Sequence, residues 1–319
     1  MGRAARRPTG RGAPLVVAID GGGTGSRLIA VSGGEPLLYL EGPPLNYTAL
    51  GADAFRENLR ALASRLPGRP AVAVAALAGS SPHLGDAAQA LREVLGAGQV
   101  AVMTDMEALL RAAAGGGDGI VVSAGTGSFA YGSCGGRAAR AGGWGYLLGD
   151  EGSAYWLGRE AVRHTLAALE AGRVDALARL VMEALGCRSL PGCIAAAHSA
   201  GRGLAALSRR LCGLSGEPAV RAILAEGAGL LAGLAERVYL ILGCPGRPRV
   251  YGAGGVIRGC RLYASYLAAE LGARGFRFAV TDASPLEGAL AAAFEAAGLG
   301  AEARNIIRQL RGKGAGSRV

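Results

Sequence analysis

Residues 15–26 read Leu-Val-Val-Ala-Ile-Asp-Gly-Gly-Gly-Thr-Gly-Ser, and the rest of the chain can be interpreted outward from this stretch. Its apolar, β-branched first half predicts a buried strand that ends at Asp20. The apolar pattern resumes over 27–32, so the glycines form a tight turn between two strands. The turn matches neither a Walker loop, which needs a lysine before a helix, nor a Rossmann turn, which opens a helix.

The turn at Gly21–Gly23 admits two interpretations. Glycines have no Cβ, so their backbone N–H groups can approach an anion, and Asp20 at the strand end could hold a cation. An ordinary glycine hairpin with an exposed acid explains the same residues. The turn alone does not decide between them.

The opening pattern returns over 119–128 as a strand, a small-residue turn and a second strand. When Thr24 is aligned with Thr126, a glycine precedes and Gly-Ser follows each threonine. Two such copies suggest a duplicated domain whose turns face each other across a cleft. Glycines also follow predicted strands at 79 and 252–255, which favours a site where backbone approaches the phosphates of a nucleotide.

The order of the predicted elements indicates an α/β fold with mixed sheets. The first part of the chain predicts, in order, strands over 15–20, 27–32 and 36–40, a helix over 53–66, a strand over 71–77, a helix over 86–95, a strand over 100–104 and a helix over 106–114. The second part predicts strands over 119–124 and 129–131, helices over 155–169, 174–185 and 218–242, strands over 249–251 and 276–281, and a helix over 284–298.

Three consecutive glycines at 115–117 mark a domain boundary or hinge. We therefore expect a disordered basic tail over 1–13, an N-terminal domain over 14–116 that the C-terminal helical segment 284–316 joins, and a larger C-terminal domain over 117–283.

Composition excludes several classes of protein. The net charge of +10 is concentrated in the two chain ends, and only 5% of the residues are aromatic, which argues against nucleic-acid binding. No apolar segment of a secretory signal precedes Pro14. The most apolar helical stretch contains Glu236 and Arg237, which argues against a membrane span.

Six cysteines occur without a Cys-x-x-Cys pair, and no histidine lies at zinc-finger spacing from them. We therefore expect a reduced, cytoplasmic protein with buried thiols. The three histidines have no partner at a meaningful spacing and receive no role.

Asp105 is the sharpest single candidate. Thr104 and Glu107 match a capping box, so Thr104 caps the following helix and leaves the Asp105 carboxylate free. A carboxylate at the end of a central strand can accept the proton of a hydroxyl that attacks phosphorus. An ordinary first-turn acid is the alternative.

Two further positions have a functional and a structural interpretation. Asp150 and Glu151 lie among glycines, where they could accept hydrogen bonds from a polyol or cap the next helix. Asn46, beside Tyr47, could bind a sugar hydroxyl or amide, or simply form a turn.

These motifs, taken together, resemble the N-acetylglucosamine kinases. The family is of the BadF/BadG type within the actin, sugar kinase and Hsp70 superfamily. The resemblance covers nearly all of 15–298, and its most specific part is Gly-Asp-Glu-Gly-Ser-Ala-Tyr-Trp at 149–156. The other matching motifs are Asp-Gly-Gly-Gly-Thr at 20–24, Asn-Tyr at 46–47, Leu-Ala-Gly at 77–79, Thr-Asp at 104–105, Ser-Ala-Gly-Thr-Gly-Ser at 123–128 and Gly-Gly-Trp-Gly at 142–145.

The resemblance implies two ribonuclease-H-like, actin-like ATPase domains, with ATP and Mg²⁺ in the cleft between them. It implies that Asp105 is the base for the 6-hydroxyl of the sugar and that Asp20 positions Mg²⁺. The implied sugar ligands are Asn46, Asp105, Gly143, Trp144, Gly145 and Asp150. The implied ATP ligands are Gly22, Gly23, Thr24, Gly125, Thr126, Gly213, Gly254 and Gly255.

One position departs from the family. Animal N-acetylglucosamine kinases carry a tryptophan two residues after the asparagine, where this chain has Thr48. Archaeal relatives include hexokinases of broad tolerance, so glucose, mannose and glucosamine join N-acetylglucosamine as expected substrates, and a homodimer is left open.

A second class shares the same fold. ATPase activators of radical dehydratases or reductases hold an iron–sulfur cluster with two cysteines from each subunit. Cys134, which follows the second turn, keeps that alternative open, although such activators lack the motif at 149–156.

Overall fold

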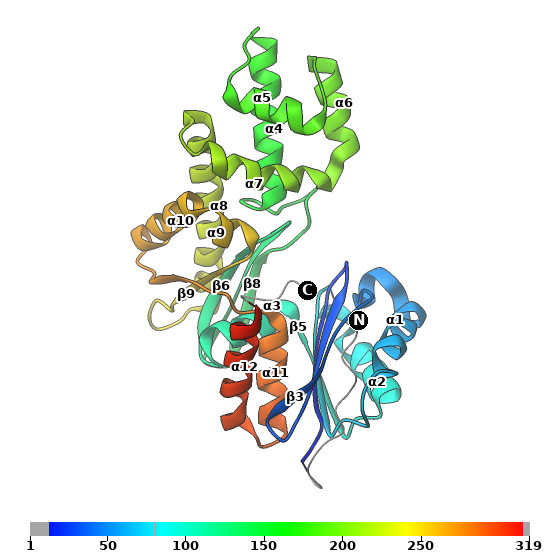
Figure 1. Ribbon diagram of the computed structural model, residues 1–319. Helices are drawn as coiled ribbons and strands as arrows, with labels where there is room; N and C mark the ends of the chain where they lie inside the picture. Colours follow the sequence, from blue (N-terminus) through cyan, green and yellow to red (C-terminus); the bar gives the residue numbers. More distant parts are fainter. Residues whose placement is uncertain (1–12, 80, 315–319) are drawn as a thin grey trace. The chain divides into compact units, whose positions relative to one another are not determined.

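The computed structural model describes residues 13–79 and 81–314 (Figure 1). Except for Ala13, the expected basic tail over 1–13 lies outside the described residues. The chain forms two compact units. Unit 1 combines the chain up to Gly116 with the chain from Ala283, and unit 2 is Gly117–Asp282.

Unit 1 is built on a five-stranded sheet in the order β3-β2-β1-β4-β5. Its strands are β1 (Val16–Gly21), β2 (Ser26–Ser32), β3 (Glu35–Gly42), β4 (Val72–Leu77) and β5 (Gln99–Thr104). The first three pair antiparallel, whereas β4 and β5 run parallel to β1. Both β1 and β4 are buried along their whole length, which is why they read as unbroken apolar runs.

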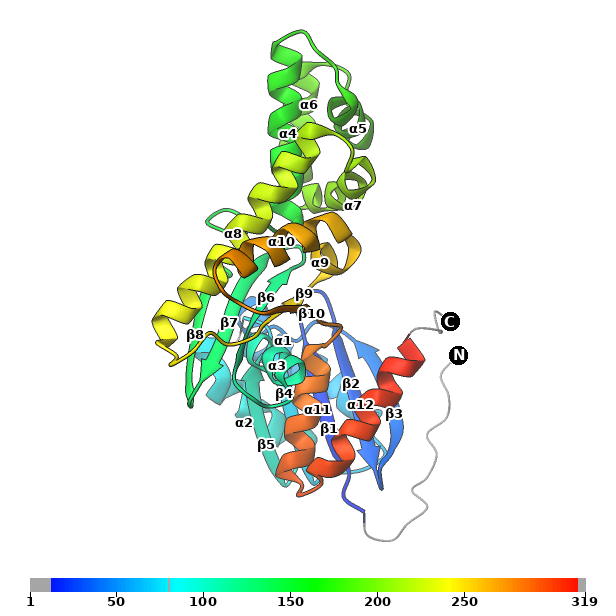
Figure 2. The same cartoon turned by 90° about the vertical axis from the view of Figure 1, so that its left-hand side faces the viewer.

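Helices cover both faces of this sheet (Figure 2). One face packs against α1 (Tyr47–Ala63) and α2 (Leu84–Leu95), which a short 3₁₀ turn (Ser81–His83) precedes. The other face packs against α3 (Asp105–Ala114), α11 (Pro285–Ala296) and α12 (Gly300–Gly314). The expected C-terminal helical segment is thus two helices.

Unit 2 repeats the topology of unit 1. Its strands are β6 (Gly119–Ala124), β7 (Ser128–Cys134), β8 (Arg137–Gly142), β9 (Val250–Ala253) and β10 (Phe278–Val280). Their order is β10-β9-β6-β7-β8, with β6, β7 and β8 antiparallel and β9 and β10 parallel to β6. Each strand of one sheet therefore has a counterpart in the other, as the repeated turn predicts.

The helices of unit 2 are more numerous than the sequence pattern indicated. They are α4 (Ala154–Glu170), α5 (Ala176–Leu185), α6 (Leu190–Ala200), α7 (Leu207–Leu211), α8 (Pro218–Leu242), α9 (Gly255–Gly259) and α10 (Arg261–Ala273), with 3₁₀ turns at Gly201–Ala206 and Cys212–Leu214. The apolar core of the unit runs between the sheet and α4, α8 and α10.

Within the described chain, the helix α8 is by itself long and apolar enough to cross a membrane. The helix α5 and the segment Leu190–Leu214 would be long and apolar enough only if they formed one bent span. Half of the apolar window of α8 is buried inside unit 2, where the helix packs on β6, β7 and β8. This burial is the behaviour of a core helix.

The expectation of reduced thiols is wrong for this structure. All six cysteines form disulfides within unit 2: Cys134–Cys244, Cys187–Cys193 and Cys212–Cys260. The partners lie 110, 6 and 48 residues apart in the chain. The tertiary fold brings two of these pairs together, so the spacing of cysteines in the sequence could not reveal them.

Candidate functional site

The predicted site residues of unit 1 gather at one edge of its sheet. In the parallel part of the sheet Gly21 pairs with Leu77, and Leu77 pairs with Thr104, so β1, β4 and β5 end at the same level. The glycine turn, the turn at Gly79 and Asp105 each follow one of these strand ends. The carboxyl ends of parallel strands are where α/β folds bind ligands.

Asp105 begins α3 at this edge. The Thr104 hydroxyl accepts a hydrogen bond from the Glu107 N–H at 3.2 Å, which confirms the predicted cap. The carboxylate is not free, however, because the backbone N–H groups of Met106 and of Asp105 itself donate to it. Burial raises the pKa of Asp105, and the neighbouring Asp20 charge raises it further. A half-buried carboxylate with a raised pKa is a stronger proton acceptor than an ordinary exposed one.

Asp20 is held by an ion pair that the sequence analysis missed. The Arg27 Nη2 atom lies 2.5 Å from Oδ2 of Asp20, since the β1–β2 hairpin places these two residues opposite each other. Burial raises the pKa of Asp20, and the guanidinium opposes this shift. The sequence did contain a signal for this pair: if the glycine turn closes a hairpin, the strand register places Arg27 opposite Asp20.

A magnesium ion would have few protein ligands here. Among the described residues, no group of three or more His, Cys, Asp or Glu side chains could form a metal cage. A single buried carboxylate at Asp20 fits a magnesium ion that phosphates and water mainly coordinate.

The glycine turn presents its backbone and Thr24 outward. The Gly22 N–H donates to the Gly25 carbonyl at 2.9 Å, which closes the turn. Gly23 and Thr24 are exposed, whereas a Cβ at Gly21 would lie only 2.6 Å from a methyl group of Leu77. The turn is therefore packed at its base and open at its tip.

Asn46 lies beside this turn. It caps α1 through its side-chain oxygen, which accepts from the Ala49 N–H at 3.1 Å. Its amide nitrogen would be 2.8 Å from a Cβ at Gly79 and 3.9 Å from one at Gly23. The Thr48 hydroxyl donates to the carbonyl of Gly79. The helix thus begins at residue 47 rather than at 53, because the kink at Gly51 hides its first turn from the apolar pattern.

The second glycine turn, in unit 2, is bound to the loop before α4. The Gly125 N–H donates to the Gly127 carbonyl at 2.9 Å, and Thr126 at the tip is exposed, like Thr24. The carboxylate of Asp150 accepts the N–H of Ser128 at 3.2 Å. Asp150 is therefore buried and already hydrogen-bonded, and it is not an open side chain in the loop.

The loop that follows β8 carries the predicted sugar residues Gly143, Trp144 and Gly145, all exposed. Both glycines have a positive φ, of 73° and 86°, which L side chains rarely adopt. The Trp144 side chain is 55% exposed and lies at the surface of unit 2.

The remaining predicted nucleotide residues lie at two other segments of unit 2. Gly254 has φ of 96°, and a Cβ there would overlap the carbonyl of Ala124 at the end of β6. Gly255, which follows it, is exposed at the start of α9. Gly213 is also exposed, and the disulfide Cys212–Cys260 ties its 3₁₀ turn to the end of α9.

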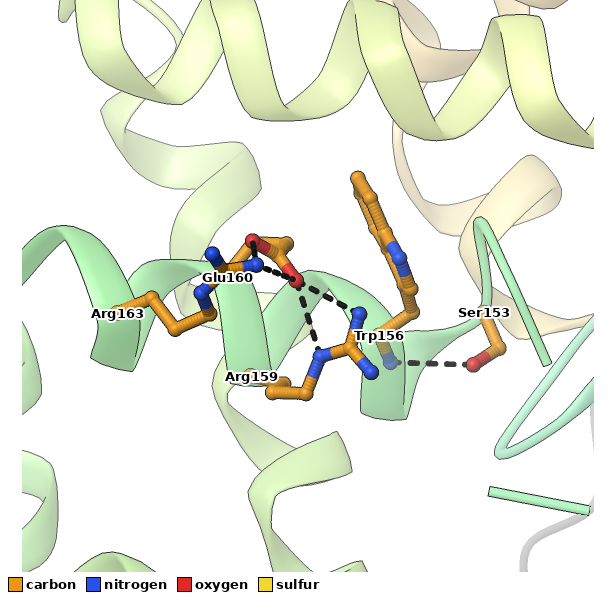
Figure 3. A network of polar contacts seen from close by, with 5 residues as sticks. All are labelled: Ser153, Trp156, Arg159, Glu160 and Arg163. Carbon is orange, nitrogen blue, oxygen red and sulfur yellow. Dashed lines mark hydrogen bonds and ion pairs between the residues drawn. The ribbon is translucent and has the colours of Figure 1, made fainter. Parts of the chain in front are cut away.

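Ser153, whose role the sequence analysis did not assign, caps α4 by accepting from the Trp156 N–H at 3.1 Å (Figure 3). One turn further on, Glu160 pairs with Arg159 at 2.8 Å and with Arg163 at 3.0 Å (Figure 3). The cap fixes where the helix begins and hence where the preceding loop ends.

Cys134 is bonded to Cys244 and is not available as a cluster ligand. The six cysteines are all described, and each has a partner in its own chain. The iron–sulfur alternative therefore has no free thiol to rest on in this structure.

The model of the BadF/BadG/BcrA/BcrD ATPase family matches residues 71–296 of the chain. The protein belongs to this family. In this chain, the range that matches the BadF/BadG/BcrA/BcrD ATPases starts just before β4 and ends with α11. It therefore includes parts of both units.

Individual relatives of this family member are kinases by name. The N-acetylmuramic acid/N-acetylglucosamine kinase of Clostridium acetobutylicum is 44% identical over 70 residues, which make up 22% of this chain and 23% of that protein. The match therefore spans less than a quarter of the curated relative.

Solved structures cover far more of the chain. A protein of Chromobacterium violaceum, proposed to be an N-acetylglucosamine kinase, has a TM-score of 0.69 and 26% identity over 86% of this chain and 97% of its own. A ROK family glucokinase from Streptomyces griseus, solved with glucose and AMPPNP, has a TM-score of 0.54 and 16% identity over 86% and 97%. The predicted α/β fold of two actin-like ATPase domains is confirmed.

Proposed function

We propose that this ATPase family member is a sugar kinase that transfers the γ-phosphoryl group of ATP to the 6-hydroxyl of N-acetylglucosamine or a related hexose or hexosamine. The relatives named as sugar kinases support the reaction class. The observation that carries the proposal is Asp105: a half-buried carboxylate with a raised pKa, at the sheet edge that also carries Asp20 and the first glycine turn.

In the proposed reaction Asp105 takes the proton of the sugar hydroxyl. The hydroxyl oxygen forms a bond to the γ-phosphorus while the bond from that phosphorus to the β,γ-bridging oxygen breaks, and ADP leaves. Because phosphoryl transfer needs positioning and charge stabilisation more than covalent chemistry, one well-placed base suffices.

The two glycine turns would hold the nucleotide. Their backbone N–H groups and the exposed hydroxyls of Thr24 and Thr126 suit phosphate oxygens. Gly213, Gly254 and Gly255 would lie along the adenosine. A magnesium ion near Asp20 would neutralise charge on the phosphates.

The sugar would contact Asn46, Asp105 and the loop at 143–150. The amide of Asn46 is preoriented by its capping bond, and it lies where a side chain at residue 79 would clash with it. Thr48 offers no aromatic surface to an acetamido group and is itself bonded to Gly79. We therefore extend the expected substrates from N-acetyl sugars to glucose, mannose and glucosamine.

The decisive test measures ADP release in a coupled assay, with ATP, Mg²⁺ and one sugar at a time. The panel contains glucose, mannose, glucosamine, N-acetylglucosamine and N-acetylmuramic acid. We expect release that depends on at least one of them and a product phosphorylated at its 6-position by NMR. ADP release that no sugar stimulates would overturn the proposal.

A further inference from the structure

Asp150 has an unusual backbone conformation. It is the one non-glycine residue with a positive φ, of 63°, in the part of the chain that the structure describes. Its side chain is nearly all buried, with 5% of the residue exposed. A left-handed conformation costs about 1–2 kcal/mol for most L residues and less for Asp and Asn. Surrounding contacts must hold such a residue in place.

The contacts are to the second glycine turn. Oδ1 of Asp150 accepts the backbone N–H of Ser128 at 3.2 Å. The carboxylate also occupies the space that a side chain at Gly127 would need, since a Cβ there would lie 2.6 Å from Oδ2. The acid and the glycine therefore fit each other.

Four further hydrogen bonds join the same two segments. The Ser128 hydroxyl donates to the Glu151 carbonyl at 2.7 Å, and the N–H of Gly143 donates to the Ser128 carbonyl at 3.0 Å. The N–H groups of Ala154 and Tyr155 donate to the carbonyls of Gly125 at 2.8 Å and Thr126 at 3.3 Å. The turn at 125–128 and the loop at 143–155 thus form one hydrogen-bonded body.

We propose that Asp150 is a positioning residue for the nucleotide: its carboxylate fixes the turn at 125–128 in the conformation that receives phosphate. Asp150 acts through the N–H of Ser128 and the space beside Gly127. The nucleotide arm of this inference needs only the ATP use of the family, whereas the link to the sugar rests on the proposed function of the loop at 143–150. Any coupling between the two ligands through this body would be the same in both directions.

Two charged residues, Arg202 and Glu151, act on the Asp150 carboxyl group. Burial raises the pKa of its carboxyl, the Ser128 N–H and Arg202 lower it, and Glu151 raises it. The same Arg202 guanidinium lies 5.7 Å from the centre of the Tyr146 ring, within the loop.

The test is calorimetric binding of ADP with Mg²⁺, in the absence of sugar, to three variants. Asp150→Asn keeps an acceptor and tolerates the positive φ; Asp150→Gly tolerates the φ but loses the acceptor. We expect Asp150→Gly to weaken ADP binding about tenfold or more, and Asp150→Asn to restore most of it. Asp118→Gly is the matched control, because Asp118 accepts the Gly135 N–H at 2.9 Å at the opposite end of the same hairpin. We expect the Asp118→Gly variant to bind ADP normally.

A substitution at Gly127 should disrupt the contact between Asp150 and the turn while Asp150 itself is kept. In Gly127→Ala the new methyl group would displace the carboxylate, so ADP binding should fall as in Asp150→Gly. The double variant Gly127→Ala/Asp150→Gly should bind no more weakly than the weaker single variant. Additive losses would contradict the inference.

Each outcome separates this inference from the kinase assignment. Normal ADP binding by a folded Asp150→Gly variant, with only the KM for sugar raised, would make Asp150 a sugar ligand alone and overturn the positioning role. If no sugar in the panel is phosphorylated, the ADP measurements still decide that role. If Asp150→Gly does not fold, the comparison of Asp150→Asn with Gly127→Ala decides it.

Discussion

Asp105 is the residue on which the chemistry depends most directly. Loss of a general base costs about 10²–10⁴-fold in rate. We expect Asp105→Asn to lower kcat by this factor while the affinity for ATP and sugar stays nearly unchanged, because Asn keeps the size and the backbone hydrogen bonds. Asp86→Asn is the control: Asp86 is also a first-turn acid of a unit 1 helix, but it is exposed. Turnover at the wild-type rate by Asp105→Asn would exclude Asp105 as the base.

The same substitution should change stability with a definite dependence on pH. The pKa of Asp105 is raised by burial. A group with a raised folded pKa contributes stability that is present below its unfolded pKa and lost as pH rises through the folded value. Ionised Asp105 is therefore a cost at neutral pH that Asn removes.

We expect Asp105→Asn to unfold at a higher temperature than wild type at pH 7, and this difference to disappear below about pH 4. Circular dichroism at several pH values measures it. A lower midpoint at pH 7 would contradict the assignment of Asp105 as an unfavourably buried charge.

Arg27 should stabilise unit 1 through Asp20. In Arg27→Gln the buried carboxylate loses its guanidinium, which costs about 1–3 kcal/mol at neutral pH, toward the lower value because Arg27 is 43% exposed. The loss should shrink as pH falls and Asp20 becomes protonated. Urea unfolding at two pH values tests this, with Arg56→Gln, which breaks the Arg56–Glu93 pair, as a nearly neutral control.

At the scale of elements, the contact between α3 and α11 depends on one glycine. A Cβ at Gly288 in α11 would overlap the carbonyl oxygen of Ala108 in α3. We expect Gly288→Ala to destabilise unit 1 by about 1–3 kcal/mol or more, as overpacking does. Gly85 in α2 has open space around its Cα, so Gly85→Ala should be neutral or slightly stabilising. Equal stability of the two variants in urea unfolding would contradict the close packing.

The sequence pattern predicted most elements because period-2 and period-3.6 patterns survive where one face is buried. The helix α8 is of this kind, whereas β1 and β4, which are buried along their whole length, were found as unbroken apolar runs. The pattern failed for β8, whose residues are small or charged and half exposed, and for α6, which buries only Cys193. Local sequence carries little signal where an element buries little apolar surface.

The candidate site was predicted unevenly for a similar reason. Motif and resemblance selected Asp20, Asp105 and Asp150 as candidates. They could not supply Arg27 as the partner of Asp20 or Ser128 as the partner of Asp150, because these partners depend on strand register and on a loop that returns to a distant turn. Which residues contact each other across the fold depends on the tertiary structure and cannot be read from single positions in the sequence.

At the scale of the whole molecule, the disulfides divide the chain unequally. All six cysteines lie in unit 2. On the chain-entropy model, a crosslink that closes a loop of about 100 residues stabilises by about 4–5 kcal/mol. Reduction should therefore lower the unfolding temperature of unit 2 and leave that of unit 1 unchanged.

The two tryptophans allow a clean measurement of this difference. Trp144 and Trp156 both lie in unit 2, so tryptophan fluorescence follows that unit alone, while circular dichroism follows both. With reductant, the fluorescence transition should move to lower temperature. The Cys134→Ser/Cys244→Ser variant should reproduce a larger share of the shift than Cys187→Ser/Cys193→Ser, since the first pair spans 110 residues and the second only 6. An unmoved transition would mean that the crosslinks do not form in solution.

The two helices α11 and α12 return to unit 1 after the whole of unit 2 has passed. On the ribosome, β1, β2 and β4 therefore emerge first but keep one apolar face uncovered until Leu286, Leu290 and Phe294 are synthesised. Unit 2 is complete in the nascent chain before unit 1 can be. A transcript that ends after residue 282 would yield a finished second unit attached to an unfinished first one, so release of a folded protein waits for the last helices to be translated.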